Sequence, residues 1–203
     1  MPGIISAYTM GFPPGWFGWE VGQGEDRANA IAERAADGAE AQALVRHGVV
    51  SFDALCRQQG VFYAAAVWVP DRSTGGCPAL ASLELLTGPT DRDASFEDAL
   101  RLAQAGRSAR GFTVFDRGVQ EMDLPAGPAI CEVTVLAEKR PRFARRGGAD
   151  PVESRVEITV FPPGCSDILR LQVVTRETDL LEALAEAART MAESLTVDVG
   201  PVP

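Results

Sequence analysis

Four strand-like segments lie in the second half of this chain, and the turns that join the first to the second and the third to the fourth are too short for a crossover. The segments are Phe112–Leu124, Ala129–Lys139, Arg155–Phe161 and Ile168–Thr175. Pro125–Pro128 alone separates the first two, and Pro162–Asp167 separates the last two. A parallel return within one sheet needs a connection of about a dozen residues or more. Neighbouring segments must therefore pair antiparallel, which argues against a parallel nucleotide-binding sheet.

The first half of the chain adds strands to this sheet. Val61–Val69 and Ala79–Leu86 are apolar at odd and even positions alike, as expected for strands buried on both faces. The turn-rich connector Pro70–Pro78 predicts that they form a hairpin. Trp16–Val21 reads as a short first strand after an irregular entry at two prolines. We expect a central antiparallel sheet of six to seven strands.

Three stretches carry the helical spacing of apolar residues. The first runs from Glu25 to Gln59 and ends at Gly60, a natural C-cap, and Gly38 and Gly48 are the places where it is weakened or broken. The second begins at the cap Ser95, and the third begins at Asp179, read as its cap. Helices in these places can cover both faces of the sheet. The prediction is an α+β fold, an α/β/α sandwich, as a single domain over residues 1–203.

Charge and composition limit the partners of this chain. It carries 28 acidic against 19 basic residues, a net charge of −9, so phosphate backbones and anionic membrane surfaces repel it. We expect no nucleic-acid or membrane partner. The N-terminus lacks the basic and long apolar regions of a secretory signal, and no window is apolar enough to span a bilayer. The expected location is cytoplasmic.

The four cysteines give no sign of a metal or cofactor. Cys56, Cys77, Cys131 and Cys165 form no C-x-x-C pair and lie far in sequence from the single histidine. A zinc site is conceivable but has no supporting spacing. Reduced, buried thiols are the expected state, because free cysteine behaves as a small hydrophobe. We predict no metal and no cofactor.

Other candidates for chemistry are isolated. His47, which any histidine-based triad would have to use, sits in the middle of a helical pattern. The acidic pairs Glu121/Asp123 and Asp91/Asp93 have no further metal ligands near them in sequence. Gly22-Gln23-Gly24 resembles a dinucleotide fingerprint but lacks its third glycine. We expect no catalytic residue and no enzyme activity.

Several stretches, together with the order of the elements, resemble a known superfamily. They are Pro14–Trp16, Leu124–Ala129, Val160–Thr175 and Asp179–Leu195. They are similar to the PsbP/LpqN-like superfamily, which includes small uncharacterised proteins of high-GC bacteria. The resemblance covers most of the chain and implies a central antiparallel sheet flanked by helices. It also implies a non-catalytic accessory role, since one member supports photosystem assembly and another binds a small GTPase. The chain lacks the lipoprotein signal that some members carry.

One short segment reverses the charge of the chain. Lys139–Gly148 is rich in arginine around Phe143 and lies between two predicted strands, where it forms a long loop. It is either a solvated loop or a docking arm whose guanidinium groups bind the carboxylates of an acidic partner. RNA or phosphate binding ranks third, because the negative field of the whole chain opposes it. The predicted partner-binding residues are Arg140, Arg142, Phe143, Arg145 and Arg146.

The aromatic stretch Phe12–Glu20 admits two interpretations. Trp16 and Trp19 are three residues apart on a strand, so they should point to opposite faces of the sheet. In a sheet covered on both sides, each could fill a core. Alternatively, the stretch lines an aromatic groove that is open to a peptide or partner.

Together these observations predict a non-catalytic accessory or adaptor protein that binds a protein partner. The alternative is a binding module with a small-molecule or peptide pocket between sheet and helices, and an enzyme that uses only carboxylates and arginines ranks third. A free strand edge also makes a homodimer plausible.

Overall fold

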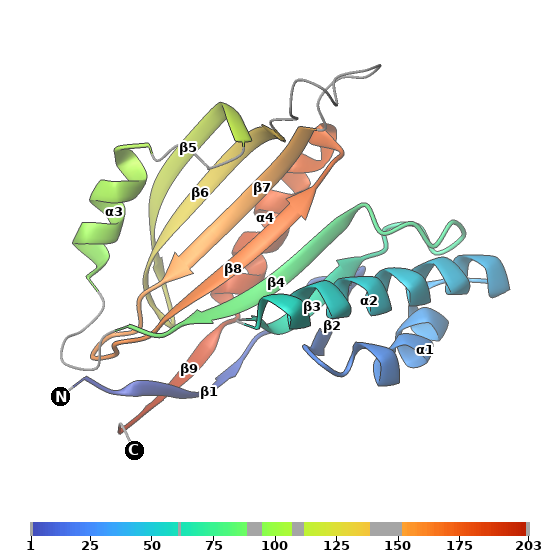
Figure 1. Ribbon diagram of the computed structural model, residues 1–203, viewed down its shortest axis with the longest axis horizontal. Helices are drawn as coiled ribbons and strands as arrows, with labels where there is room; N and C mark the ends of the chain where they lie inside the picture. The colour runs from blue at the N-terminus through green and yellow to red at the C-terminus, as the bar shows by residue number, and fades with distance from the viewer. Residues whose placement is uncertain (1, 61, 89–94, 107–111, 139–151, 202–203) are drawn as a thin grey trace.

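A twisted antiparallel sheet of seven strands forms the centre of the protein (Figure 1). The computed structural model describes residues 2–60, 62–88, 95–106, 112–138 and 152–201. The order of the strands across the sheet is β2-β3-β4-β8-β7-β6-β5, and every pair is antiparallel. The strands are β2 (Trp16–Glu20), β3 (Phe62–Trp68), β4 (Ala79–Leu86), β5 (Phe112–Leu124), β6 (Gly127–Glu138), β7 (Val152–Val160) and β8 (Ile168–Thr175). This confirms the predicted α+β architecture.

Helices cover both faces of this sheet, as predicted. The helices are α1 (Gly24–Ala35), α2 (Ala39–Gln59), α3 (Phe96–Gln104) and α4 (Leu181–Glu193). Helices α1 and α2 pack against β2 and β3, whereas α4 packs against β7 and β8 from behind the sheet in the view of Figure 1. None of the described helices is both long and apolar enough to cross a bilayer.

Two hydrophobic cores follow from the alternation of side chains along β3. Ala64 and Ala66 face the α4 side, where Leu83, Leu171 and Leu184 are buried. Ala65 and Val67 face α1 and α2, where Val45 and Val49 are buried. Small side chains on both faces of β3 let the helices approach the sheet closely. The prediction of a strand buried on both faces is confirmed.

The helix boundaries test the capping predictions one by one. Gly38, at a φ of +82°, separates α1 from α2, whereas α2 runs unbroken through Gly48 and ends at Gly60 in the left-handed conformation. Ser95 accepts a hydrogen bond from the Asp98 amide at 3.2 Å, as its capping role requires. The assignment of Asp179 as a cap is wrong, because Thr178–Leu180 forms a 3₁₀ turn and α4 begins at Leu181 without a side-chain cap.

The two ends of the described chain form a separate two-stranded ribbon that the sequence analysis missed. Strand β1 (Ile4–Thr9) pairs antiparallel with β9 (Thr196–Gly200), so that Ile4 lies opposite Gly200. The Asp167 carboxylate anchors the ribbon by accepting a hydrogen bond from the Ile5 amide at 3.0 Å. The ribbon places β1 beside the first strands of the main sheet and creates a cleft between them.

Candidate functional site

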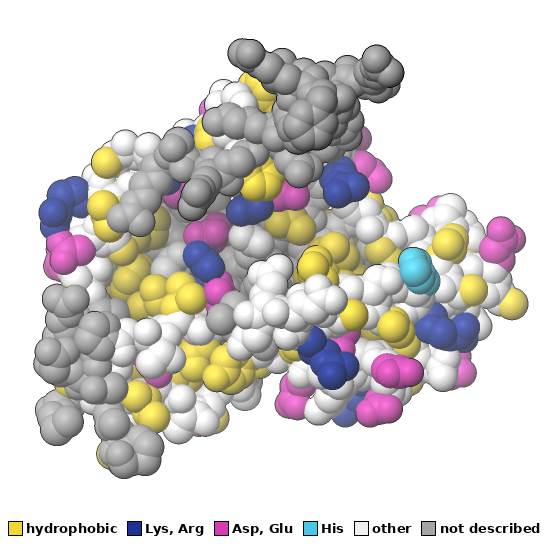
Figure 2. Space-filling view, in the orientation of Figure 1, with side chains coloured by type: hydrophobic (Ala, Val, Ile, Leu, Met, Phe, Trp, Pro, Cys, Tyr) yellow, Lys and Arg dark blue, Asp and Glu magenta, His cyan; other side chains and the backbone are white. Residues whose placement is uncertain are grey.

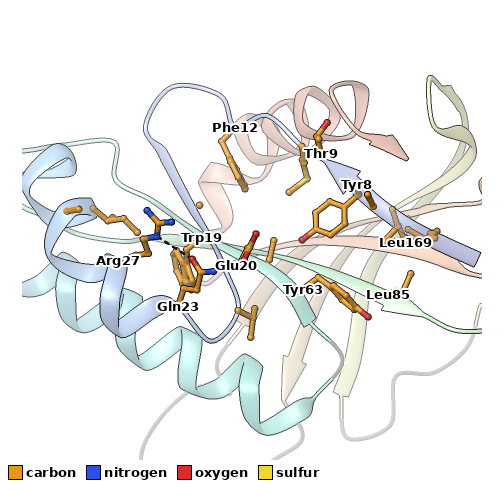
Figure 3. A pocket seen from close by; sticks show the side chains of 18 of the residues that line it. Tyr8, Thr9, Phe12, Trp19, Glu20, Gln23, Arg27, Tyr63, Leu85 and Leu169 are labelled. Carbon is orange, nitrogen blue, oxygen red and sulfur yellow. Dashed lines mark hydrogen bonds between the residues drawn. The ribbon is translucent and has the colours of Figure 1, made fainter. Parts of the chain in front are cut away.

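A cleft lies where β1, the edge strand β2 and helix α1 meet. Its volume is about 980 Å³, near the upper end of the range for ligand pockets. Figure 3 shows side chains from β1 and β3 on one side, side chains from α1 on the other, and Trp19 and Glu20 of β2 between them. The cleft therefore wraps around the open edge of the main sheet.

The β1 side of the cleft is aromatic. Tyr8 and Tyr63 meet edge to face, with their ring centroids 6.3 Å apart, and 48% of Tyr63 remains exposed. Phe12 lies against the backbone of Gly18, where the Cβ of any other residue would overlap its ring. Burial, and then the nearby Glu20 carboxylate, raises the pKa of Tyr8, so its hydroxyl stays protonated and can donate a hydrogen bond.

The α1 side of the cleft is polar and carries positive charge. Gln23 donates a hydrogen bond to the Glu20 carboxylate at 2.6 Å and accepts one from Arg27 at 3.3 Å. The Arg34 guanidinium lies 5.9 Å from the centre of the Phe17 ring, in cation–π range. Arg27 and Arg34 line the cleft, whereas no acidic residue of α1 does.

A buried carboxylate holds the β2 end of the cleft in place. Asp53 of α2 is 4% exposed and accepts hydrogen bonds from the Trp19 indole at 2.9 Å and the Gly22 amide at 2.8 Å. Residue 24 must be glycine, because a Cβ there would overlap the Asp53 side chain. The Gly22-Gln23-Gly24 motif therefore serves packing against Asp53, and the amide of its first glycine already has a carboxylate partner.

The structure divides Phe12–Glu20 between buried residues and residues that line the cleft, and the core interpretation is confirmed for its two tryptophans. Trp16 is buried in the α4-side core and Trp19 in the α1/α2 core, so the spacing of three does place them on opposite faces. Phe12, Gly18 and Glu20 line the open cleft. The sequence missed Tyr8, Tyr63, Arg27 and Arg34, because only the tertiary fold brings their segments together.

A second hollow lies between α2 and the face of the sheet that α4 does not cover. It has a volume of about 640 Å³, with an apolar wall that includes Phe52 and Leu55 and a floor that includes Ser82, Arg155 and Gln172. In Figure 2, basic and acidic side chains gather on this face beside α2. Arg155 is paired with Glu153 at 2.7 Å, and the Gln172 amide donates a hydrogen bond to the Glu157 carboxylate at 3.3 Å.

Of the residues that the sequence analysis considered for catalysis or metal binding, the described His47, Glu121 and Asp123 line neither hollow. Arg140, Arg142, Phe143, Arg145 and Arg146 lie outside the described residues, as do Asp91 and Asp93. His47 is exposed on the surface of α2, and Glu121 and Asp123 are exposed on the edge strand β5. Within the described part of the chain, no three histidine, cysteine or acidic residues are grouped to hold a metal ion.

Burial makes the thiols of Cys56 and Cys77 poor nucleophiles. It raises the pKa of Cys56 and of Cys77 to about 11, and the Asp53 carboxylate adds to the shift at Cys56. Nearly all of each thiol population is therefore protonated at neutral pH. Both thiols border the hollow beneath α2.

We therefore expect Cys56 and Cys77 to react with a disulfide reagent at pH 8 about a hundredfold more slowly than in the unfolded chain. Two pKa units lower the thiolate fraction by that factor, since only the thiolate attacks. Stopped-flow thiol titration with and without guanidinium measures the ratio. Equal rates in the folded and unfolded protein would contradict this account.

Comparison with known proteins finds similarity in structure only. No family model matches the chain, and no curated protein matches it. The structure of LpqN, involved in cell envelope biogenesis of Mycobacterium tuberculosis, is 14% identical and matches 97% of this chain and 86% of its own, with a TM-score of 0.48. The Saccharomyces cerevisiae Ran-binding protein Mog1p is 10% identical and matches 94% of this chain and 90% of its own, with a TM-score of 0.46. A structure from Bacteroides thetaiotaomicron is 10% identical and matches 97% of this chain and 48% of its own, with a TM-score of 0.40. LpqN, from which the superfamily named in the sequence analysis takes part of its name, is thus among the similar structures.

Proposed function

We propose that this protein is a non-catalytic binding protein that docks a protein partner in the cleft between β1, β2 and α1. The observation that carries the proposal is the composition of the cleft walls. The exposed Tyr63 and the half-buried Tyr8 and Phe12 offer aromatic surface on one side of the cleft. Arg27 and Arg34 offer positive charge on the other side. Aromatic and arginine side chains dominate the binding energy of protein interfaces.

Site-specific crosslinking tests this proposal. A photoreactive benzophenone amino acid is placed at Tyr63, in the cleft, and in a matched variant at Phe115, which is 65% exposed on β5 and does not line the cleft. Irradiation in the native cell should give a discrete adduct from position 63 and none from position 115. The captured protein, produced separately, should then bind the unmodified chain. Adducts of equal yield at both positions, or none at position 63, would refute docking in the cleft.

The arginine-rich segment 139–148 provides a second test of the same partner. We propose that Arg140, Arg142, Arg145 and Arg146 strengthen the complex through acidic groups of that partner. Once the partner is in hand, deletion of 139–148 should weaken binding most at low salt, because screening removes long-range attraction. Unchanged affinity at every ionic strength would exclude this segment.

The hollow beneath α2 favours a second candidate, a small polar molecule. Its apolar wall could cover a ligand while Ser82 and Gln172 on its floor offer hydrogen bonds. A thermal-shift screen of metabolites separates the two candidates. A hit that disappears in Gln172→Leu but survives in a cleft variant would favour the hollow, and a screen without hits would remove it.

A further inference from the structure

The outer edge of β2 has backbone groups that no described strand uses. The Val69 amide donates to the Gly15 carbonyl at 2.8 Å, and the Val21 amide donates to the Tyr63 carbonyl at 3.0 Å. Bonding alternates along an antiparallel pair, so the odd-numbered residues between them bond β3. The N–H and C=O of Gly18 and the N–H of Glu20 therefore point away from β3, and both residues are exposed.

This free stretch is short and has defined ends. The Trp16 amide donates to the Pro13 carbonyl at 3.1 Å, and the Glu20 carbonyl accepts from the Gln23 amide at 3.0 Å. These hydrogen bonds within the chain therefore prevent another strand from pairing beyond Trp16 and Glu20. The open groups between them face the cleft.

The opposite edge of the sheet is protected in the usual ways. Strand β5 carries a bulge between Val114 and Asp116, and Asp116, Glu121 and Asp123 are exposed along it. Bulges and charged side chains prevent edge-to-edge pairing. Of the two edges, β2 is the one that remains able to accept another strand.

The walls on the two sides of β2 differ in a way that specifies the sequence of such a strand. Successive residues of a strand point to opposite faces. One set would face Arg27 and Arg34 of α1, and the other would face Tyr8 and Phe12. Figure 3 shows Arg27 and Phe12 on separate sides of β2.

We propose that the cleft binds an extended segment of the partner in which acidic and apolar residues alternate, and that this segment adds to the outer edge of β2 as a further strand. The inference rests on the proposed function and specifies its ligand. Main-chain hydrogen bonds to Gly18 and Glu20 supply affinity, and the two walls supply selectivity. The acidic side chains pair with Arg27 and Arg34.

The test uses an acetylated, amidated pentapeptide of alternating valine and glutamate. Its controls are the valine–lysine pentapeptide and a valine–glutamate peptide with alternate amides N-methylated. The net charge of −9 would favour the lysine peptide if only the field of the whole protein acted. Preference for glutamate would therefore report the local arginines.

A pair of variants at one position separates backbone from side-chain effects. Glu20→Pro removes the outward N–H of an edge strand, where proline is tolerated, and Glu20→Ala keeps it. Titration followed by NMR should show millimolar or tighter binding and slowed exchange of the Gly18 amide. Glu20→Pro should bind the peptide about tenfold or more weakly than Glu20→Ala does, and N-methylation should weaken binding to the original chain by about the same factor.

The inference is wrong if the glutamate peptide does not bind, if the lysine peptide binds as well, or if Glu20→Pro and N-methylation both leave the affinity unchanged. Retention of the Tyr63 crosslink in Glu20→Pro would overturn strand addition alone and leave docking in the cleft intact. If the crosslink from position 63 is also absent in the chain that keeps Glu20, the proposed function itself is wrong.

Discussion

Arg170→Ala is expected to lower the free energy of unfolding by about 3 kcal/mol. The Arg170 guanidinium donates from Nε to the Glu84 carboxylate at 2.6 Å and donates to it from Nη2 as well. The side chain of Glu84 is only 7% exposed, whereas that of Arg170 is 33% exposed. Removal of the arginine leaves the largely buried Glu84 carboxylate without its counter-ion. Urea unfolding followed by circular dichroism measures the loss.

A surface pair supplies the matched control. Arg101 and Asp98 are 74% and 63% exposed, so Arg101→Ala should cost less than about 1 kcal/mol. Replacing both partners of the covered pair, as in Arg170→Met with Glu84→Leu, should recover most of the stability lost in Arg170→Ala. If Arg170→Ala costs no more than Arg101→Ala, burial of Glu84 is not what makes this pair matter.

Asp53→Ala should cost about 3 kcal/mol, because two donors on the β2 side of the cleft lose their acceptor at once. The Trp19 indole and the Gly22 amide both bond the Oδ1 atom of Asp53. Fluorescence of the tryptophans should shift to the red as Trp19 loses its buried partner, and exchange of the Gly22 amide should accelerate. Thermal unfolding gives the stability change.

Asp53→Asn separates the hydrogen bonds from the charge. Asparagine keeps an oxygen at the same position and can accept both bonds, although neutral acceptors bind more weakly than charged ones. We expect it to lose about 1 kcal/mol and to keep slow exchange at Gly22. Equal losses in the alanine and asparagine variants would show that the charge of Asp53, rather than its two bonds, stabilises this corner.

Local patterns in the sequence predicted the main sheet well, because every pair of adjacent strands except β4 and β8 is consecutive among the described strands. The parity argument placed Trp16 and Trp19 in different cores, and the Ser95 cap and the Gly60 terminus were found from residue type alone. Each of these features depends on contacts within a few residues or on one short turn.

The features that were missed depend on distant contacts. The β1–β9 ribbon joins residues at opposite ends of the described chain, so no short-range pattern links its two strands. Leu44 and Leu55 share the helical spacing of α2 but are 53% and 49% exposed, because the helix meets the sheet over a narrower stripe than the pattern suggested. The cleft combines β1, β2 and α1, so no single stretch of sequence could reveal it.

The ribbon also sets an order of events during translation. Strand β9 emerges from the ribosome after every other described strand, yet β1, which emerges first, pairs only with it. Tyr8 can therefore take its final place in the wall of the cleft only when the whole main sheet has already been synthesised. A nascent chain halted before β9 would present β2 without the β1 wall, so the proposed recognition would arise only once β9 has been made.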